Sequence, residues 1–146
     1  MQASATWTGG YQTRLDDRRG HEVVIDLPRD EDGQDAGTSA LELAVLSLAG
    51  CISTIFALVA RRRRVAYSAM RVDLTADRPR GSPTVTGVQG TMTIATPSPQ
   101  EEVETVLSIT LRTCPVGVIF ERARIPIQVT VVRAAEPPAR SSPSVA

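Results

Sequence analysis

Two cysteines, Cys51 and Cys114, are the residues of this 146-residue chain best suited to carry chemistry. A thiolate is a strong nucleophile, and two thiols brought together form a disulfide. Two cysteines and one histidine are too few for a four-ligand zinc site, so we expect no bound metal. The first twenty residues lack the apolar segment of a secretory signal, so we expect a cytoplasmic protein whose thiols stay reduced. A redox pair is the functional interpretation, and two small buried hydrophobic residues are the alternative.

Cys51 lies in the long apolar segment 39–60, SALELAVLSLAGCISTIFALVA, which four arginines follow. A helix that is apolar on every side is either covered by protein or spans a membrane. The segment is just long enough to span. However, polar residues interrupt it, and neither end carries the aromatic residues typical of a membrane interface. We therefore expect a buried central helix.

Glu42 and the arginines at 61–64 have structural interpretations at the two ends of this helix. Glu42 follows Ser39 by three residues, the spacing of a capping box. Arginines suit the negative end of the helix dipole. A phosphate or nucleic-acid site is the rival interpretation. We do not favour it because the 16 basic and 16 acidic residues balance, aromatics are only 3%, and no second basic cluster occurs.

The remaining segments predict short strands around two helices. Segments 3–8, 11–15 and 21–27 are expected to form an antiparallel meander, in which Val23, Ile25 and Leu27 share one face, and 30–37 a flexible polar loop. Segments 70–77 and 88–95 alternate as a hairpin would, and 125–132 alternates as a last strand. From Glu136 onward the composition is that of a disordered tail.

The second cysteine lies where two helices are predicted to meet. Ser98 is the expected N-cap of a helix that continues to Cys114, with Glu101 completing a capping box. Pro115 then breaks the helix and opens a short one over 116–122, with Cys114 as its cap. A thiolate is stabilised at a helix N-terminus, so we expect a lowered pKa for Cys114.

The order of these segments and four local motifs resemble the osmotically induced protein C / organic hydroperoxide resistance (OsmC/Ohr) family. WTGGYQTRL with HEVVIDLP is similar to the opening meander of that family, and GTSALELAVLSLAGCIST to its helix with the first cysteine. MRVDLTADRP is similar to the strand after that helix, and TCPVGVIFERARIPIQVTV to the second-cysteine element and the last strand. Together the motifs cover about residues 5–133.

The resemblance implies an α+β, OsmC-like fold with antiparallel strands wrapped around a long buried central helix and a second helix, in an intertwined homodimer. We expect a single OsmC-like domain over residues 1–135 and a disordered C-terminal tail over 136–146. The resemblance also implies a cytoplasmic protein of the oxidative stress response, with no nucleic-acid or membrane partner.

By the same resemblance, Cys51 corresponds to the peroxidatic and Cys114 to the resolving cysteine of a thiol-dependent peroxidase. Cys51 would reduce an organic hydroperoxide and become a sulfenic acid, with which Cys114 would condense to a disulfide. An external dithiol, a lipoyl group or another thiol, would then reduce the disulfide. No bound cofactor is implied.

Two positions depart from the hydroperoxide-resistance branch. That branch has an arginine directly after the Gly-Gly turn and a glutamate ten residues before the first cysteine, where this chain has Tyr11 and Leu41. Glu42, nine residues before Cys51, fits the broader OsmC-like branch. The candidates for the missing cation are Arg14, Arg18 and Arg19. The alternative function is therefore an OsmC-like protein that binds a small apolar ligand without significant peroxidase activity.

Overall fold

The computed structural model describes residues 1–134, so the predicted tail lies outside the described residues. The chain divides into two compact units, Met1–Leu46 (unit 1) and the part from Ser47 onward (unit 2), which we describe in turn. The boundary falls inside the longest helix, α1 (Ala40–Arg63). The expectation of one domain over residues 1–135 stays a prediction.

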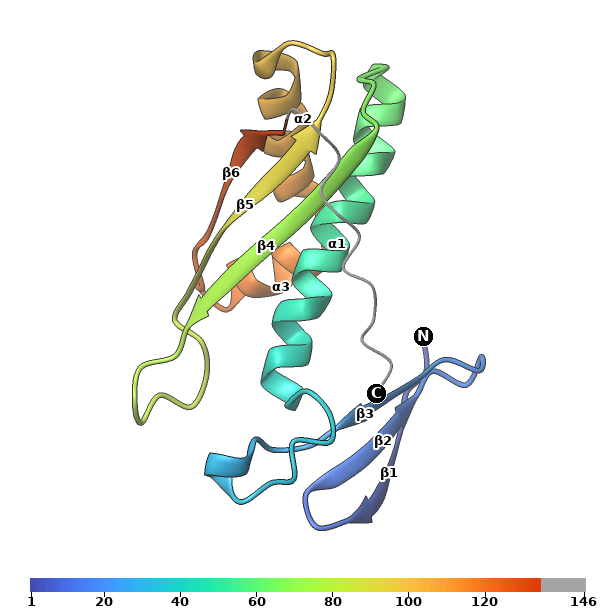
Figure 1. Cartoon of the computed structure of the whole chain (residues 1–146), viewed down its shortest axis with the longest axis vertical. Helices are drawn as coiled ribbons and strands as arrows, with labels where there is room; N and C mark the ends of the chain where they lie inside the picture. The colour runs from blue at the N-terminus through green and yellow to red at the C-terminus, as the bar shows by residue number, and fades with distance from the viewer. Residues whose placement is uncertain (135–146) are drawn as a thin grey trace. The chain divides into compact units, whose positions relative to one another are not determined.

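Unit 1 contains three short antiparallel strands in the order β1-β2-β3: β1 (Ser4–Gly9), β2 (Gln12–Asp16) and β3 (Glu22–Ile25) (Figure 1). The predicted opening meander is therefore confirmed. Gly9 and Gly10 form its first turn with φ of 133° and 53°, which glycine adopts without steric cost. Of the three residues predicted to share one face of segment 21–27, Ile25 and Leu27 are half-buried, whereas Val23 is 42% exposed.

Asp26 organises the loop that follows β3 and contains the short helix η1 (Arg29–Glu31). Its carboxylate is only 3% exposed and accepts hydrogen bonds from the backbone N–H groups of Leu27, Gln34 and Ala36 at 2.9, 3.1 and 3.1 Å. Burial raises the pKa of Asp26, but the donors together outweigh burial and hold the pKa below its ordinary value. The loop, expected to be flexible, thus has a backbone path fixed by one carboxylate.

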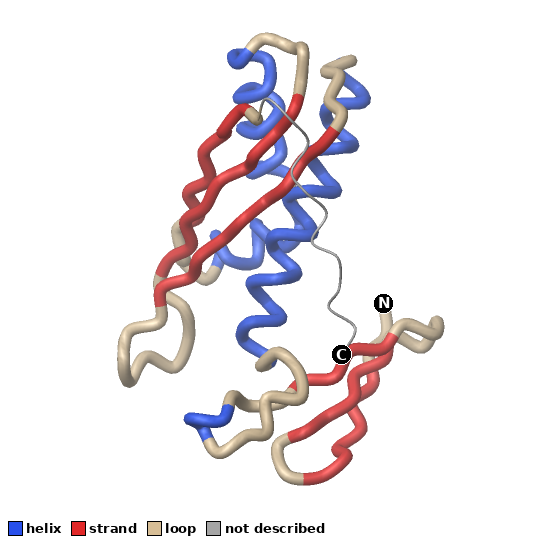
Figure 2. Tube along the Cα trace, viewed as in Figure 1, coloured by secondary structure: helices blue, strands red, loops and turns tan. Residues whose placement is uncertain are grey.

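Unit 2 contains a three-stranded sheet in the order β4-β5-β6, formed by β4 (Ala69–Asp77), β5 (Gly87–Ala95) and β6 (Ile127–Arg133). Helices α2 (Gln100–Thr113) and α3 (Pro115–Arg122) lie with α1 on one face of this sheet (Figures 1 and 2). The α+β class is confirmed. In one detail it differs from our expectation of antiparallel strands: β6 runs parallel to β5, because α2 and α3 form the crossover between them.

The core of unit 2 forms between one stripe of α1, the sheet and α2. Fully buried side chains from the three layers are Leu48, Ile52 and Phe56 of α1, Met92 and Ile94 of β5, and Val103 and Val106 of α2. The opposite stripe of α1 is exposed in the described chain, and Leu58 there is 47% exposed. By length and composition α1 could cross a membrane, and 28% of its most apolar window is buried. The predicted central helix is therefore covered on one face.

The start of α2 differs from the predicted capping box. The N-cap is Pro99, and no side chain caps the helix. Ser98 instead donates its backbone N–H to Thr96 Oγ1 at 3.0 Å, and its carbonyl accepts a hydrogen bond from Arg133 at 2.8 Å. Contacts with the end of β6 thus hold Ser98 outside the helix, which local sequence could not indicate.

Candidate functional site

Cys51 of α1 and Cys114 meet within unit 2. The Cys114 thiol donates a hydrogen bond to Cys51 Sγ, and the two sulfur atoms are 2.9 Å apart. This distance exceeds a disulfide bond of about 2.05 Å, so both cysteines are free thiols. Cys51 is half-buried, whereas Cys114 has no exposed surface. The pair can form a disulfide after a small movement, and Cys51 is the more exposed of the two residues.

Cys114 lies at the junction of α2 and α3, whose axes differ by 63°. Its backbone N–H donates to the carbonyl of Thr110 at 2.8 Å and so ends α2. Its sulfur accepts a hydrogen bond from the N–H of Gly117 at 3.3 Å and so caps α3, with Pro115 as the first helical residue. The predicted cap is confirmed, and it holds Cys114 Sγ in place from both helices.

The predicted lowering of the Cys114 pKa is wrong. The pKa of Cys114 is raised to about 11, first by burial and then by the hydrogen bond that its thiol donates to Cys51. The N–H of Gly117 acts in the opposite direction but is the smaller effect. A short helix does not stabilise a thiolate enough to offset the loss of water. Cys114 therefore keeps its proton at neutral pH.

Gly117 is a residue of the site that the sequence analysis missed. A Cβ added there would lie 3.2 Å from the Cβ and 3.5 Å from the Sγ of Cys114. The first distance is shorter than an ordinary van der Waals contact, and the second is an ordinary one. Glycine at this position therefore lets the backbone N–H approach the buried sulfur. The available signal was a glycine three residues after a capping cysteine, where a cap receives its hydrogen bond.

Glu42 performs the capping role that its spacing predicts. Its carboxylate accepts from the N–H of Ser39 at 2.7 Å and from the hydroxyl of Thr38 at 3.3 Å, while the N–H of Glu42 donates to Ser39 Oγ at 3.3 Å. The backbone and hydroxyl of Ser39 are the main causes of its lowered pKa. The capping box of α1 is confirmed, and any further role in the cysteine site stays a prediction.

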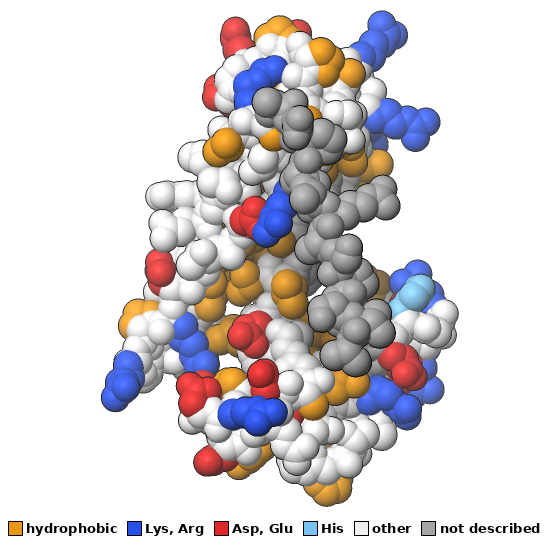
Figure 3. Space-filling model, viewed as in Figure 1, with side chains coloured by type: hydrophobic (Ala, Val, Ile, Leu, Met, Phe, Trp, Pro, Cys, Tyr) orange, Lys and Arg blue, Asp and Glu red, His pale blue; other side chains and the backbone are white. Residues whose placement is uncertain are grey.

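The three candidate activating arginines lie in unit 1 and pair with acidic side chains there. Arg14 pairs with Glu22 at 3.9 Å, Arg18 with Asp16 at 3.8 Å, and Arg19 with Asp17 at 2.8 Å. Within the described part of unit 2, the sulfur of Cys51 is hydrogen-bonded to Cys114 alone. The arginines at 61–64 are exposed at the end of α1, where Figure 3 shows projecting basic side chains. Nowhere in residues 1–134 do three His, Cys, Asp or Glu side chains gather to hold a metal ion.

These features define an α+β protein with a buried dithiol pair between its longest helix and a helix–helix junction. The family model described as OsmC-like protein matches residues 33–130. The chain therefore belongs to the OsmC-like family, as its motifs predicted. No curated protein sequence matches the chain.

Solved structures share this fold at low sequence identity. An OsmC-like protein from Mycoplasma pneumoniae is 15% identical with a TM-score of 0.81, over 91% of this chain and 96% of that one. A protein from Psychrobacter arcticus, described as a putative osmotic stress induced and detoxification response protein, is 21% identical with a TM-score of 0.76, over 92% and 96%. An organic hydroperoxide resistance protein from Legionella pneumophila is 18% identical with a TM-score of 0.72, over 89% and 94%. At these identities the likeness concerns the fold alone.

Proposed function

We propose that this protein is a thiol-dependent peroxidase that reduces organic hydroperoxides through Cys51 and Cys114. The observation that carries the proposal is the 2.9 Å separation of the two sulfur atoms, one half-buried and one fully buried. Solved structures with this fold include proteins named for organic hydroperoxide resistance, from Legionella pneumophila and Elizabethkingia anophelis, which supports the substrate class.

The proposed cycle begins at Cys51, since it is the accessible sulfur. Its thiolate attacks the outer oxygen of the hydroperoxide, the O–O bond breaks, and the alcohol leaves with a proton while Cys51 becomes a sulfenic acid. Cys114 then loses its proton and attacks the Cys51 sulfur, which releases water and forms the disulfide. One hydroperoxide is thereby reduced, and two thiols are oxidised.

An external dithiol, such as a lipoyl group, closes the cycle. Because Cys114 is fully buried, we expect the dithiol to attack Cys51 Sγ and to displace Cys114 as the leaving thiolate, which takes up a proton. The second thiol of the reductant then releases Cys51, and the reductant becomes a cyclic disulfide. A reducing cytoplasm, in which the thiols stay free between turnovers, suits this cycle.

A homodimer accounts for the uncovered stripe of α1. Ser47, Gly50, Thr54 and Leu58 recur at helical spacing and are all exposed in the described chain. Cys51 lies at the border of this stripe, so a second copy on it would shield the reactive sulfur from water. The measurement is molar mass by light scattering: Leu58→Glu is expected to give monomer where the unchanged chain gives dimer. If the unchanged chain is monomeric at all concentrations, the homodimer proposal is rejected.

The peroxidase proposal is tested by counting free thiols after mixing the reduced protein with one equivalent of cumene hydroperoxide. We expect both thiols to disappear within seconds. Cys114→Ser should still lose its single thiol, to a sulfenic acid that dimedone traps, whereas Cys51→Ser should be inert. Unchanged thiols in the natural sequence, or equally fast loss in Cys51→Ser, would reject the proposal.

One observation favours the alternative, an OsmC-like protein that binds a small apolar ligand without significant turnover. Within unit 2 the hydrogen-bond partner of the Cys51 sulfur is Cys114, a neutral thiol that does not supply the positive charge needed to activate a thiolate. Under this alternative, cumene hydroperoxide binds reversibly and both cysteines stay reduced. The thiol count therefore separates the two functions in one experiment.

A further inference from the structure

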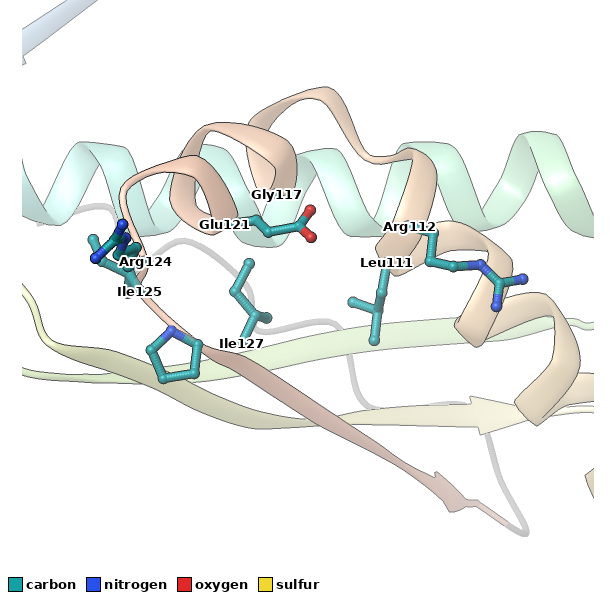
Figure 4. Close-up of a pocket in the computed structure, with 8 residues that line it drawn as sticks. Leu111, Arg112, Gly117, Glu121, Arg124, Ile125 and Ile127 are labelled. Atoms are coloured by element: carbon teal, nitrogen blue, oxygen red, sulfur yellow. The ribbon is translucent and has the colours of Figure 1, made fainter.

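A second candidate site lies in unit 2, in a hollow of about 430 Å³ between the end of α2, helix α3 and the start of β6 (Figure 4). Neither cysteine lines it. Its volume falls within the range of small-molecule pockets, roughly 300 to 1,000 Å³. The function proposed above makes no use of this hollow.

The lining combines an apolar floor with a charged rim. Leu111, Ile125, Pro126 and Ile127 supply the floor, and all but the proline are half-buried. The charged lining residues are Arg112, Glu121 and Arg124, all exposed. Within residues 1–134 none of these three forms an ion pair, although exposed arginines elsewhere in the chain do. The rim therefore carries a net positive charge with two unpaired guanidinium groups.

The two arginines are not equivalent. Arg112 and Arg124 lie at opposite ends of the hollow, and the carboxylate of Glu121 is directed toward the Arg112 end (Figure 4). Glu121 lies between the two arginines and is the acidic residue of the lining. The backbone of Arg124 has φ 59° and donates its N–H to the carbonyl of Glu121 at 2.9 Å, which sets where its side chain leaves the chain. The Arg124 end, next to Ile125 and Pro126, is the better anion site.

We propose that this hollow binds a small monocarboxylate with an apolar body. The carboxylate pairs with Arg124, whose planar guanidinium matches it with two parallel hydrogen bonds. The apolar body lies on Ile125, Ile127 and Leu111. Glu121, as the acidic residue of the lining, is expected to weaken the binding of an anion at the rim.

Octanoate is the probe, titrated into the reduced full-length chain and followed by amide chemical shifts. We expect saturable shifts at the backbone amides of Gly117, Ile125 and Ile127. Acetate, which lacks the body, and octan-1-ol, which lacks the charge, should each bind at least about tenfold more weakly, the size of effect expected from one charge-assisted pair or a few buried methylene groups. Octan-1-ol binding as tightly as octanoate would overturn the proposal.

Matched variants assign the contacts. Arg124→Gln should weaken octanoate binding about tenfold, and Arg112→Gln should weaken it less. Arg122→Gln, which removes an exposed arginine of α3 that does not line the hollow, should leave binding unchanged. Glu121→Gln should tighten octanoate binding. Equal effects of Arg124→Gln and Arg122→Gln would overturn the proposal.

The result is independent of the cysteine chemistry. A double variant, Cys51→Ser with Cys114→Ser, should bind octanoate as the unchanged chain does, because neither sulfur lines the hollow. Loss of peroxide reactivity thus leaves this inference standing, and loss of octanoate binding leaves the peroxidase proposal standing. Shifts that cluster around Cys51 instead of Ile125 would place octanoate in the cysteine site and reject the second site.

Discussion

Cys114 is both the buried partner of Cys51 and the residue that joins two helices. Its raised pKa, about 11 because of burial, means that almost all molecules hold it as a thiol near neutral pH. In the cycle that we propose, the attack of Cys114 on the sulfenic acid of Cys51 requires the thiolate. As long as the pH is below this pKa, the thiolate fraction rises about tenfold for each unit by which the pH increases.

We therefore expect disulfide closure to accelerate about tenfold per pH unit between about pH 7 and pH 9. The measurement mixes reduced protein rapidly with hydroperoxide at several pH values. Samples are then quenched with dimedone at increasing times, so that the loss of the sulfenic acid can be followed. The first thiol loss, at Cys51, serves as the internal reference. A closure rate that does not change with pH would show that a base or a movement of Cys114 controls the step.

Gly117 should set the position of the resolving sulfur. In Gly117→Ala the added Cβ would press on the Cys114 side chain, which is fully buried and cannot move away freely. A displacement of a few tenths of an ångström from the reactive geometry is expected to slow closure by roughly tenfold, with the first step unchanged. The rate of each thiol loss measures this directly.

Gly87→Ala is the matched control, since a Cβ there would meet only ordinary contacts of 3.8 Å or more. Equal closure rates in Gly117→Ala and Gly87→Ala would contradict a positioning role for Gly117.

Asp26 should make the stability of the protein sensitive to acid. Its lowered pKa means that its contribution is fully present above the unfolded-state value of about 3.9 and is lost as the pH falls through the folded-state pKa. Asp26→Asn is expected to lower the free energy of unfolding at neutral pH. The difference from the unchanged chain should shrink below about pH 4, as urea unfolding at several pH values would reveal. A constant difference down to strongly acidic pH would exclude the linkage.

At the scale of the element, α1 has one stripe committed to the core. Phe56 is fully buried, and its ring meets that of Tyr67 edge to face at a centroid distance of 6.0 Å. Phe56→Ala is expected to cost about 3–5 kcal/mol of unfolding free energy through the cavity that it leaves. Leu58→Ala, on the exposed stripe of the same helix, should cost less than about 1 kcal/mol in a dilute monomer. Similar, concentration-independent losses in both variants would contradict this assignment of faces.

The elements that depend on local pattern were predictable, and those that depend on distant partners were not. The capping box of Ser39 and Glu42 and the alternation of Met70 to Asp77 need only neighbouring residues, and both were found. The cap at Ser98 was not found: Pro99 is the N-cap, and the Ser98 carbonyl accepts a hydrogen bond from Arg133, at the far end of β6. The direction of β6 likewise depends on the path of two helices, which strand patterns do not contain.

The candidate site divides in the same way. The two cysteines were identifiable by residue type and family motif, and the structure brings their sulfur atoms together. The pKa of Cys114 was predicted in the wrong direction because a capping position is visible in the sequence, whereas complete burial is a property of the packed core. Gly117 was missed because its importance depends on how closely the chain approaches a buried sulfur.

At the scale of the whole molecule, a Cys51–Cys114 disulfide would join two residues 63 positions apart. Closing a loop of that length removes entropy from the unfolded chain worth about 4 kcal/mol. The oxidised protein should therefore melt on the order of 10 °C above the reduced protein. Calorimetry of peroxide-treated and dithiothreitol-treated samples measures the difference, with Cys114→Ser as the control that should show none. Equal melting temperatures in both redox states would mean that the disulfide does not form or strains the fold.

The position of Cys114 at a helix junction also bears on how long each molecule survives. Proteases cut a protein through its transiently opened forms, and the cross-link would make those forms rarer. The disulfide-bonded protein should then resist proteolysis better than the reduced protein. When reductant is scarce, a larger fraction of the protein would be in the disulfide-bonded form, which would be degraded more slowly until a dithiol reduces it.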